Sequence, residues 1–332
     1  MGFLGVSSLH FWYNGGIVQH MKSHGMNGAP WRDRRSAGKE LPMDCDVAYY
    51  EFYNVEQNGP VTFTSDTGHT HECYYYIYTP IDGEIDESTP VVVYVTHGGG
   101  TADEERAIAL GWAAGFETRA IIISPSSDRP DAVCAVLEDA KRRLSGCGDF
   151  DAVSAHGTSS GGRAVIRAAL KSVDPTAGYS FRFSNVFAYD PARESADASI
   201  TDQTEWMRLL AQQGVVLFFQ TDTDTNARHG GSGWLCNQYA ETYSNVGGTA
   251  IVAEISSGDH EAKFIKPLSH NSMNWAIGRG MLKEDEHYQN SWYYYQDGVK
   301  YACSLADADR LLNPVRLRRA AANVSSSVLK IK

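Results

Sequence analysis

The sequence predicts an α/β fold, a doubly wound and mostly parallel sheet with helices on both faces. Short apolar runs alternate along the chain with amphipathic stretches of ten to fifteen residues, as strands and helices alternate in βαβ units. One apolar run, at residues 90–96, is almost entirely β-branched, which is typical of a strand buried on both of its faces. A chain of 332 residues is long enough to bury a substantial core around such a sheet.

The strand predictions rest on short runs of β-branched and aromatic residues. The run at 71–78 alternates its aromatic residues between two faces, as an antiparallel strand at the edge of a sheet does. The later runs are almost wholly apolar and indicate strands that are covered on both faces. In chain order the predicted strands are 47–53, 61–64, 71–78, 90–96, 120–123, 152–156, 184–189, 215–219 and 250–255.

Four helices are predicted between the later strands. The first has Asp128 as its N-cap and Pro130 in its first turn, and its apolar residues form one stripe that ends at Leu144. The second begins near Ser160, and the other two cover residues 202–213 and 234–245. Parallel strands need a crossover of about a dozen residues or more, and these helices provide it.

The regular alternation covers only the middle of the chain. Residues 1–55 are predicted to be an irregular N-terminal extension packed on the core, and residues 56–282 to be the α/β domain. Residues 283–332 are predicted to be a C-terminal appendage outside the sheet, and its basic tail carries five cations and no acid after position 312. We therefore expect one domain with an appendage at each end.

The composition excludes several classes of function. A formal net charge of −11 at pH 7 argues against nucleic acid as a partner. No run approaches the ~18 apolar residues that a membrane span requires. The N-terminus lacks the basic start and the apolar core of a signal peptide, so we expect a cytoplasmic protein. The six cysteines are scattered without metal-binding spacing and are expected to be free thiols.

The most specific signal lies at the junction of the strand 152–156 with the helix near Ser160. Residues 157–161 read G-T-S-S-G, with Ser159 at the centre. A serine in such a corner adopts a strained backbone that exposes its hydroxyl, and the residues two before and two after it approach too closely for side chains. The N–H groups of the following helix point to where negative charge would develop. The pattern predicts Ser159 as a nucleophile.

Three further features follow the carboxyl ends of predicted strands, where open α/β sheets bind their ligands. The run His97–Gly100, H-G-G-G, follows the strand 90–96, and its glycines let backbone N–H groups approach a substrate oxygen. Asp222 and Asp224 follow the strand 215–219, and His260 follows the strand 250–255. A hydroxyl nucleophile needs a base, and that base needs a group that orients it. The chain order Ser, Asp, His is the one that this kind of sheet uses.

Together these features resemble the α/β-hydrolase superfamily, in its esterase or feruloyl-esterase-like branch, over roughly residues 60–280. The resemblance implies that Ser159 is the nucleophile and His260 the base. It also implies an aspartate that orients His260, and the usual spacing of the family selects Asp224, with Asp222 as the second choice.

The same resemblance implies an oxyanion hole formed by the backbone N–H groups of Gly98, Gly99 and Ser160. The expected enzyme is a serine esterase that cleaves a small-molecule carboxylic ester, carbohydrate- or aryl-linked, through an acyl-enzyme. Neither a cofactor nor a metal is implied. Asp222-x-Asp224-x-Asn226 is similar to the start of a calcium loop, but that loop's later glycine and glutamate are missing.

Alternatives remain open for both the residues and the activity. His97 is interpreted as structural and Asp259 as a residue that shapes its loop. The histidines that compete with His260 for the role of base are His156, His229 and His270. The alternative activities are a serine peptidase of the prolyl-oligopeptidase type and a non-catalytic binding protein on a hydrolase fold.

Overall fold

The computed structural model describes residues 12–13, 16–17, 53–81, 84–95, 120–191, 203–222, 232–255 and 290–311. The chain divides into two compact units, Met1–Glu40 and Leu41–Lys332. In the first unit, the short strands β1 (Trp12–Tyr13) and β2 (Gly16–Ile17) pair antiparallel. That residues 1–55 pack on the core stays a prediction.

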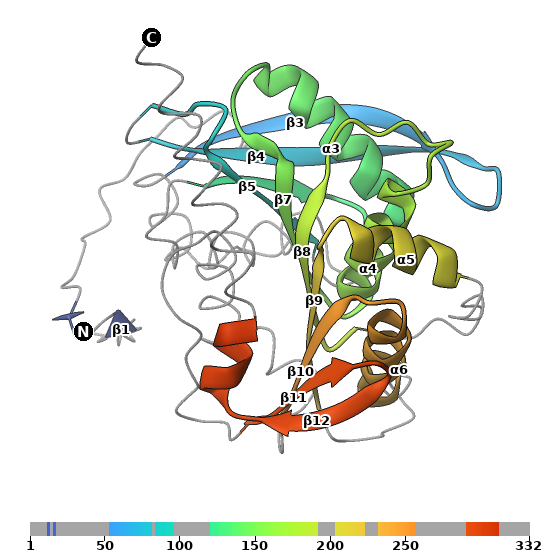
Figure 1. The fold of residues 1–332 in the computed structure, drawn as a ribbon. Helices are drawn as coiled ribbons and strands as arrows, with labels where there is room; N and C mark the ends of the chain where they lie inside the picture. Colours follow the sequence, from blue (N-terminus) through green and yellow to red (C-terminus); the bar gives the residue numbers. More distant parts are fainter. Residues whose placement is uncertain are drawn as a thin grey trace, which may run out of the picture. The chain divides into compact units, whose positions relative to one another are not determined.

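The described part of the second unit is built on a ten-stranded mixed sheet (Figure 1). The strand order is β12-β11-β10-β9-β8-β7-β5-β6-β4-β3. In this spatial order, the neighbouring strands from β10 through β9, β8, β7 and β5 to β6 pair parallel. The pairs at both ends of the sheet are antiparallel. The bounds are β3 (Tyr53–Thr64), β4 (Thr70–Pro80), β5 (Pro90–Val95), β6 (Ile121–Pro125), β7 (Asp149–Thr158), β8 (Phe183–Tyr189), β9 (Val216–Asp222), β10 (Thr249–Ile255), β11 (Asn290–Gln296) and β12 (Val299–Cys303).

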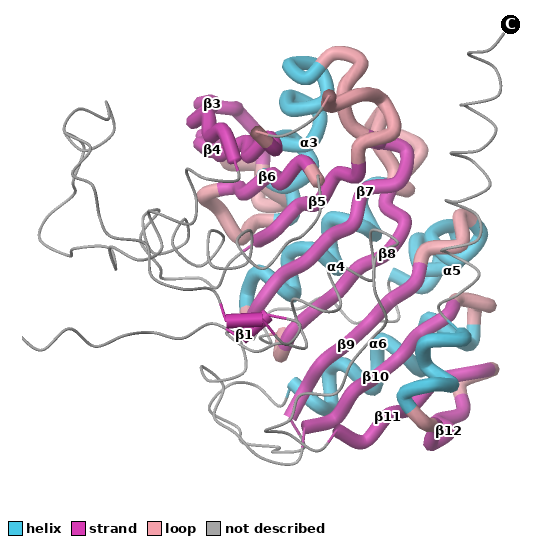
Figure 2. Tube along the Cα trace, turned by 90° about the vertical axis from the view of Figure 1, so that its left-hand side faces the viewer, coloured by secondary structure: helices cyan, strands magenta, loops and turns pink. Residues whose placement is uncertain are grey.

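Helices lie on both faces of this sheet. One face is covered by α3 (Pro130–Leu144), α4 (Ser160–Ser172), α5 (Thr204–Gln212) and α6 (Ser232–Asn245), as Figure 2 shows. Every second side chain of the central strands points to this face and forms a core with apolar side chains of these helices. The remaining strand side chains point to the other face, where the helix at 305–311 packs on them through Ala308. The predicted fold class is therefore confirmed. None of the described helices is long and apolar enough to cross a membrane.

The order of the central strands determines where a site can form. β5 pairs with β6 on one side and with β7 on the other. The chain therefore runs from β5 to β6 in one direction, returns across β5 to β7, and continues through β8 and β9 to β10 in the other direction. Where the strand order reverses, the two connections leave the sheet on opposite sides and open a crevice at the carboxyl ends of the strands. In this sheet the reversal lies between β5 and β7.

Most predicted elements are confirmed to within a few residues, and the differences have physical causes. The run 71–78 was expected at the edge of the sheet, but β4 pairs with both β3 and β6, and β3 is the edge strand. The first half of β3 is largely polar because an edge strand leaves much of its surface in water, so the sequence pattern does not mark it. The N-cap of α3 is Arg129 rather than Asp128, with Pro130 as the first helical residue. Residues 47–52 lie outside the described residues.

The prediction that the chain leaves the sheet after residue 283 is wrong. β11 pairs antiparallel with β10, and β12 pairs with β11, so residues 290–303 extend the sheet at its end. The aromatic run of β11 buries Trp292 and Tyr295, and Asp297-Gly298 forms the two-residue turn to β12. Asp-Gly between two strands of alternating polarity is a strong hairpin signal, and here it marks this turn. The division into three segments otherwise stays a prediction.

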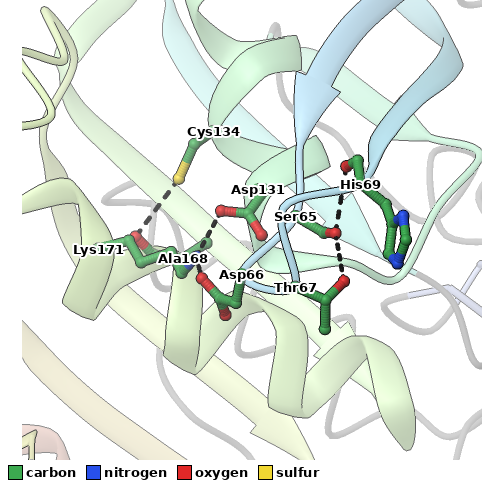
Figure 3. A network of polar contacts seen from close by, with 8 residues as sticks. All are labelled: Ser65, Asp66, Thr67, His69, Asp131, Cys134, Ala168 and Lys171. Carbon is green, nitrogen blue, oxygen red and sulfur yellow. Dashed lines mark hydrogen bonds and ion pairs between the residues drawn. The ribbon is translucent and has the colours of Figure 1, made fainter.

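A cluster of polar contacts ties the β3–β4 turn to two helices (Figure 3). Lys171, in the last turn of α4, forms ion pairs with Asp66 of that turn and with Asp131 in the first turn of α3. Burial alone would lower the pKa of Lys171, but the hydrogen bonds and charges of the two aspartates raise it. Nearby, the Cys134 thiol lies 3.6 Å from the Ala168 carbonyl oxygen, and burial raises its pKa to about 12. This thiol therefore stays protonated and acts as a small apolar side chain.

A buried carboxylate joins α3 to β4. Asp139 is 5% exposed, and it accepts hydrogen bonds from the Tyr75 hydroxyl at 2.5 Å and from Arg143 Nε at 2.7 Å. Burial on its own would raise the pKa of Asp139, but the hydrogen bonds from Tyr75 and Arg143 outweigh it and the pKa is lowered. The ionised carboxylate is thus stabilised in the folded state.

Asp139→Asn should lower the free energy of unfolding by about 1–3 kcal/mol at pH 7, because it removes the charge from these hydrogen bonds. A lowered pKa stabilises the fold above the unfolded pKa of about 3.9, and the stabilisation is lost as the pH falls through the folded value. Urea unfolding should therefore show a smaller difference between wild type and variant at pH 3 than at pH 7. Asp151→Asn, at a side chain that is 83% exposed, is the control and should change little. An equal difference at both pH values would contradict the electrostatic role of Asp139.

Candidate active site

Ser159 lies in the corner between β7 and α4, in the conformation that the sequence predicts. Its φ is 52° and its ψ is −121°, in a region that residues other than glycine seldom adopt. The Ser159 N–H donates to the Tyr189 carbonyl oxygen of β8 at 2.9 Å, and the Ser159 carbonyl accepts from the Arg163 N–H at 3.2 Å. The Ser159 side chain makes no capping hydrogen bond to the helix, and both Ser159 and Ser160 are half-buried. The Ser159 hydroxyl therefore does not cap α4.

Sterics require a glycine at position 157 and favour one at position 162. A Cβ atom at Gly157 would lie 2.3 Å from the Gly161 carbonyl oxygen and 2.8 Å from the Gly162 nitrogen, closer than real Cβ contacts come. A Cβ atom at Gly162 would lie 3.1 Å from the Gly157 oxygen and 3.2 Å from Pro191 Cβ. β7 and α4 therefore meet backbone to backbone, as the G-x-S-x-G spacing predicts. We call this corner, residues 157–161, the elbow.

The elbow lies at the reversal of the strand order. Val95, the last residue of β5, is paired with Gly157. On the other side, Thr158 is paired with Tyr189 of β8, and Tyr189 with Gln220 of β9. The carboxyl ends of these parallel strands therefore share one edge of the sheet, next to Ser159. This edge is where an α/β sheet of this order places its ligand.

The structure describes some of the predicted site residues and leaves others outside. Ser159 and Ser160 are placed together in the elbow, and the backbone of Asp222 is the last residue of β9. β9 is longer than predicted, so Asp222 belongs to the strand and is paired with Ile255 of β10. The predicted residues that lie outside the described ranges are His97, Gly98, Gly99, Gly100, Asp224, His229, Asp259, His260 and His270. Their roles stay predictions.

His156, one of the rival bases, has a structural place in the sheet. It is fully buried on β7 and stacks on Phe187 at 4.7 Å between ring centroids. Its Nε2 lies 2.8 Å from the Ser154 hydroxyl, and its Nδ1 lies 3.1 Å from the Tyr189 hydroxyl. Ser154 donates its own proton to Asn185, so it accepts from Nε2–H, and Tyr189 then donates to Nδ1. The Nδ1 contact with Tyr189 and the hydrogen bond from Ser154 to Asn185 join β7 to β8, and we assign no catalytic role to His156.

One residue of this edge was missed by the sequence analysis. Asp190, directly after β8, is 1% exposed and has a φ of 45°. Its N–H donates to the Gln220 carbonyl oxygen at 2.6 Å. The only sequence signal was an acidic residue immediately after an apolar strand, next to the strand that carries Ser159. That signal is weak, since aspartate is common where strands end.

A mixed sheet with a central reversal of strand order carries a strained serine between strand and helix at that reversal. This is the α/β-hydrolase fold. The fold places a serine hydroxyl at the edge of the sheet and backbone N–H groups of the next helix beside it. It hosts many activities, so the reaction has to be inferred from the site itself.

Comparisons with known proteins give only distant similarities. No family model matches the chain, and a search of curated proteins finds no match. Among solved structures, it is similar to a hyperthermophilic esterase from Pyrobaculum calidifontis, with 15% identity, 71% of this chain and 90% of that one covered, and a TM-score of 0.47. It is also similar to a thermostable esterase from Pseudomonas putida ECU1011, with 15% identity, coverages of 73% and 91%, and a TM-score of 0.46. Neither similarity identifies the substrate of this chain.

Gly157→Ala should disrupt the elbow, because its Cβ would meet backbone that cannot rotate away. We expect a loss of about 1–3 kcal/mol in the free energy of unfolding. If the protein cleaves an ester, at least a tenfold loss of turnover should accompany it. Gly178→Ala is the comparison, since Gly178 has open space around it and its positive φ of 66°, which Gly157 does not share, adds backbone strain without a clash. Thermal unfolding and ester turnover of both variants check this, and an alanine tolerated equally well at both positions would contradict the steric argument.

Proposed function

We propose that this protein is a serine hydrolase that cleaves a small-molecule carboxylic ester through an acyl-enzyme. The observation that carries the proposal is Ser159, held at a φ of 52° in the elbow at the reversal of the strand order. Ser159 is half-buried at this point, and backbone strain of this kind concentrates at functional sites. The expected class is a carboxylesterase, with a feruloyl- or acetyl-esterase-like specificity for carbohydrate- or aryl-linked substrates.

In the proposed mechanism, Ser159 Oγ attacks the ester carbonyl while His260 takes its proton. His260 then returns the proton to the leaving alcohol, which leaves Ser159 acylated. In the second half of the reaction, water attacks the acyl carbonyl while His260 takes a proton from it, and His260 returns this proton to Ser159 Oγ as the acid is released. Asp224 orients His260 and stabilises its charged form. The backbone N–H groups of Gly98 or Gly99, together with that of Ser160, hold the oxyanion.

Three features of the described residues support these roles. Ser160 is the first residue of α4, and the first N–H groups of a helix have no acceptor within it and lie at the positive end of its dipole. The glycine-rich run begins two residues after Val95, which is paired with Gly157 of the elbow. Among the histidines that compete with His260, His156 is engaged by Ser154 and Tyr189. A prolyl-oligopeptidase-type peptidase and a non-catalytic binding protein remain the alternatives that experiment has to separate.

Ser159→Ala should fold like wild type and lower the turnover of a p-nitrophenyl or feruloyl ester by about 10⁴–10⁶-fold, because the members of a triad act as a unit. A fluorophosphonate probe should label the wild-type protein at Ser159 and leave the alanine variant unlabelled, with the adduct mapped by mass spectrometry. Retention of a tenth of the wild-type activity would refute the assignment. An active enzyme that prefers a prolyl amide to every ester would favour the peptidase, and a protein that is neither labelled nor active would favour a binding role.

The acid is tested by paired substitutions two residues apart. Asp224→Asn should cost about 10⁴-fold in turnover with little change in melting temperature, because the acid selects the tautomer of the base and stabilises its protonated form. Asp222→Asn should mainly destabilise the loop after β9, by about 1 kcal/mol, because the Asp222 carboxylate is expected to cap this turn by accepting backbone N–H bonds. Turnover and thermal unfolding of both variants separate the two roles. The reverse pattern would make Asp222 the acid.

A further inference from the structure

The two end strands of the described sheet, β3 and β12, each pair with one neighbour and leave one side of their backbone open (Figure 2). An open strand can pair with a strand of another chain, and proteins prevent this with prolines, bulges and charged side chains. β3 has such protection, since it carries exposed polar residues and Pro60 lies at a register shift in its pairing with β4. β12 contains neither a proline nor a register shift. The two ends of the sheet are therefore built differently.

β12 presents apolar side chains to solvent. Val299 is 48% exposed and Tyr301 is 42% exposed, whereas most large apolar side chains of the other strands are buried. The two residues are two positions apart in a strand, so they point to the same face of the sheet. The Tyr301 ring also stacks on Tyr294 of β11, with 5.2 Å between the ring centroids. Val299 and Tyr301 thus form an exposed apolar ridge along the end of the sheet.

The one charged side chain of β12, Lys300, is directed away from the open side. Its ammonium group forms an ion pair with Glu254 of β10 at 2.5 Å and lies 4.0 Å from the centre of the Tyr293 ring of β11. The lysine side chain therefore reaches back across β11. A lysine protects an end strand when its charge stands at the open side, and here that charge is held elsewhere.

The hairpin that carries β12 is fixed to α6. The Gly298 N–H, in the turn between β11 and β12, donates to the Ser244 hydroxyl of α6 at 3.0 Å. The Tyr295 hydroxyl of β11 donates to the Asn237 side chain of the same helix. A strand that is already ordered loses little conformational entropy when another strand pairs with it.

The hairpin geometry determines which backbone groups of β12 face outward. Residues that flank a two-residue turn exchange hydrogen bonds, and such pairs alternate with non-bonded pairs along an antiparallel ladder. Val299 flanks the turn, so Val299 and Tyr301 bond to β11. The N–H and C=O groups of Lys300 and Ala302 therefore point to the open side.

A second copy of β12 fits these outward groups. In an antiparallel pair about a two-fold axis at Tyr301, Lys300 of each copy exchanges hydrogen bonds with Ala302 of the other. Tyr301 then lies opposite its own copy, and Val299 lies opposite Cys303. Apolar side chains meet one another on one face, and on the other face Lys300 meets a small neutral residue instead of a like charge. The strand is thus complementary to itself.

We propose that the protein forms a two-fold symmetric dimer in which the β12 strands of two copies pair antiparallel and join their sheets. The inference does not depend on the proposed function, because no residue of the elbow takes part. Strand addition of this kind satisfies the open backbone groups of both copies and covers Val299 and Tyr301. A two-fold pairing closes on itself, and the protected β3 at the other end does not extend it, so association stops at two copies.

The molar mass in solution tests the dimer, measured by analytical ultracentrifugation at concentrations up to about 100 μM, where an association of micromolar affinity is nearly complete. The wild-type protein should have twice the mass of one chain. Tyr301→Lys should halve this mass, because it places two like charges opposite each other across the axis. Tyr74→Lys is the matched control and should leave the mass unchanged, since Tyr74 is 45% exposed but lies on β4, which has a neighbour on both sides.

Ala302→Pro is the second variant and covers the case in which Tyr301→Lys does not fold. It removes an N–H that points to the open side, so it should give a monomer whose β11–β12 bonds remain, with folding checked by circular dichroism. A monomeric wild-type protein would overturn the proposal and leave the open side of β12 to an extended segment of a different protein. A dimer that persists in the folded variants at positions 301 and 302 would also overturn it, because the copies would then meet through another surface.

Discussion

The contact between the backbones of Gly157 and Gly161 constrains the structure around the elbow. A side chain at Gly157 would overlap the Gly161 carbonyl at 2.3 Å, so β7 can turn directly into α4 only without one. The turn forces Ser159 to a positive φ and aims the start of α4 at the edge of the sheet. Because α4 also packs on α3 and is tied by Lys171 to Asp131, this one approach sets the position of the helix layer relative to β7. The position of Ser159 thus follows from a steric requirement.

The strand order explains why the elbow can serve as a site. β5 and β7 are neighbours whose connections leave in opposite directions, so the edge beyond Val95 and Thr158 is not closed by a single crossover. Beneath this edge, the chain of hydrogen bonds from Tyr189 through His156 to Ser154 fixes β8 against β7. A fully satisfied buried network of this kind rigidifies the part of the core that it joins. The carbonyl that accepts the Ser159 N–H belongs to Tyr189. Tyr189 is thus bonded to β7 twice, through its backbone to Ser159 and through its side chain to His156.

Much of the fold could be predicted from the sequence, because the elements that matter most are buried. The strands from residue 90 to 255 and the helices between them are marked by unbroken apolar runs and stripes, and the structure confirms them. The outer strands of the sheet are predicted less well. An edge strand is partly solvated, so β3 looks polar, and β11 needed the Asp297-Gly298 turn to be recognised as part of a hairpin. For the site, sterics made Ser159 predictable from glycine spacing, whereas Asp190 depends on a register between β7, β8 and β9 that no local pattern encodes.

The two left-handed residues at this edge also bear on stability. Strained backbone of this kind costs of order 1–3 kcal/mol at each residue and persists only where the surroundings over-determine it. Ser159 is held by the Tyr189 carbonyl and Asp190 by the Gln220 carbonyl, so each strained residue is fastened to the neighbouring strand through its own N–H. These bonds lie at the end of the central strands, whose apolar side chains are almost wholly buried. The buried centre of the sheet thus supports strained backbone at Ser159, which is the arrangement expected if the precise placement of Ser159 matters more than its local energy.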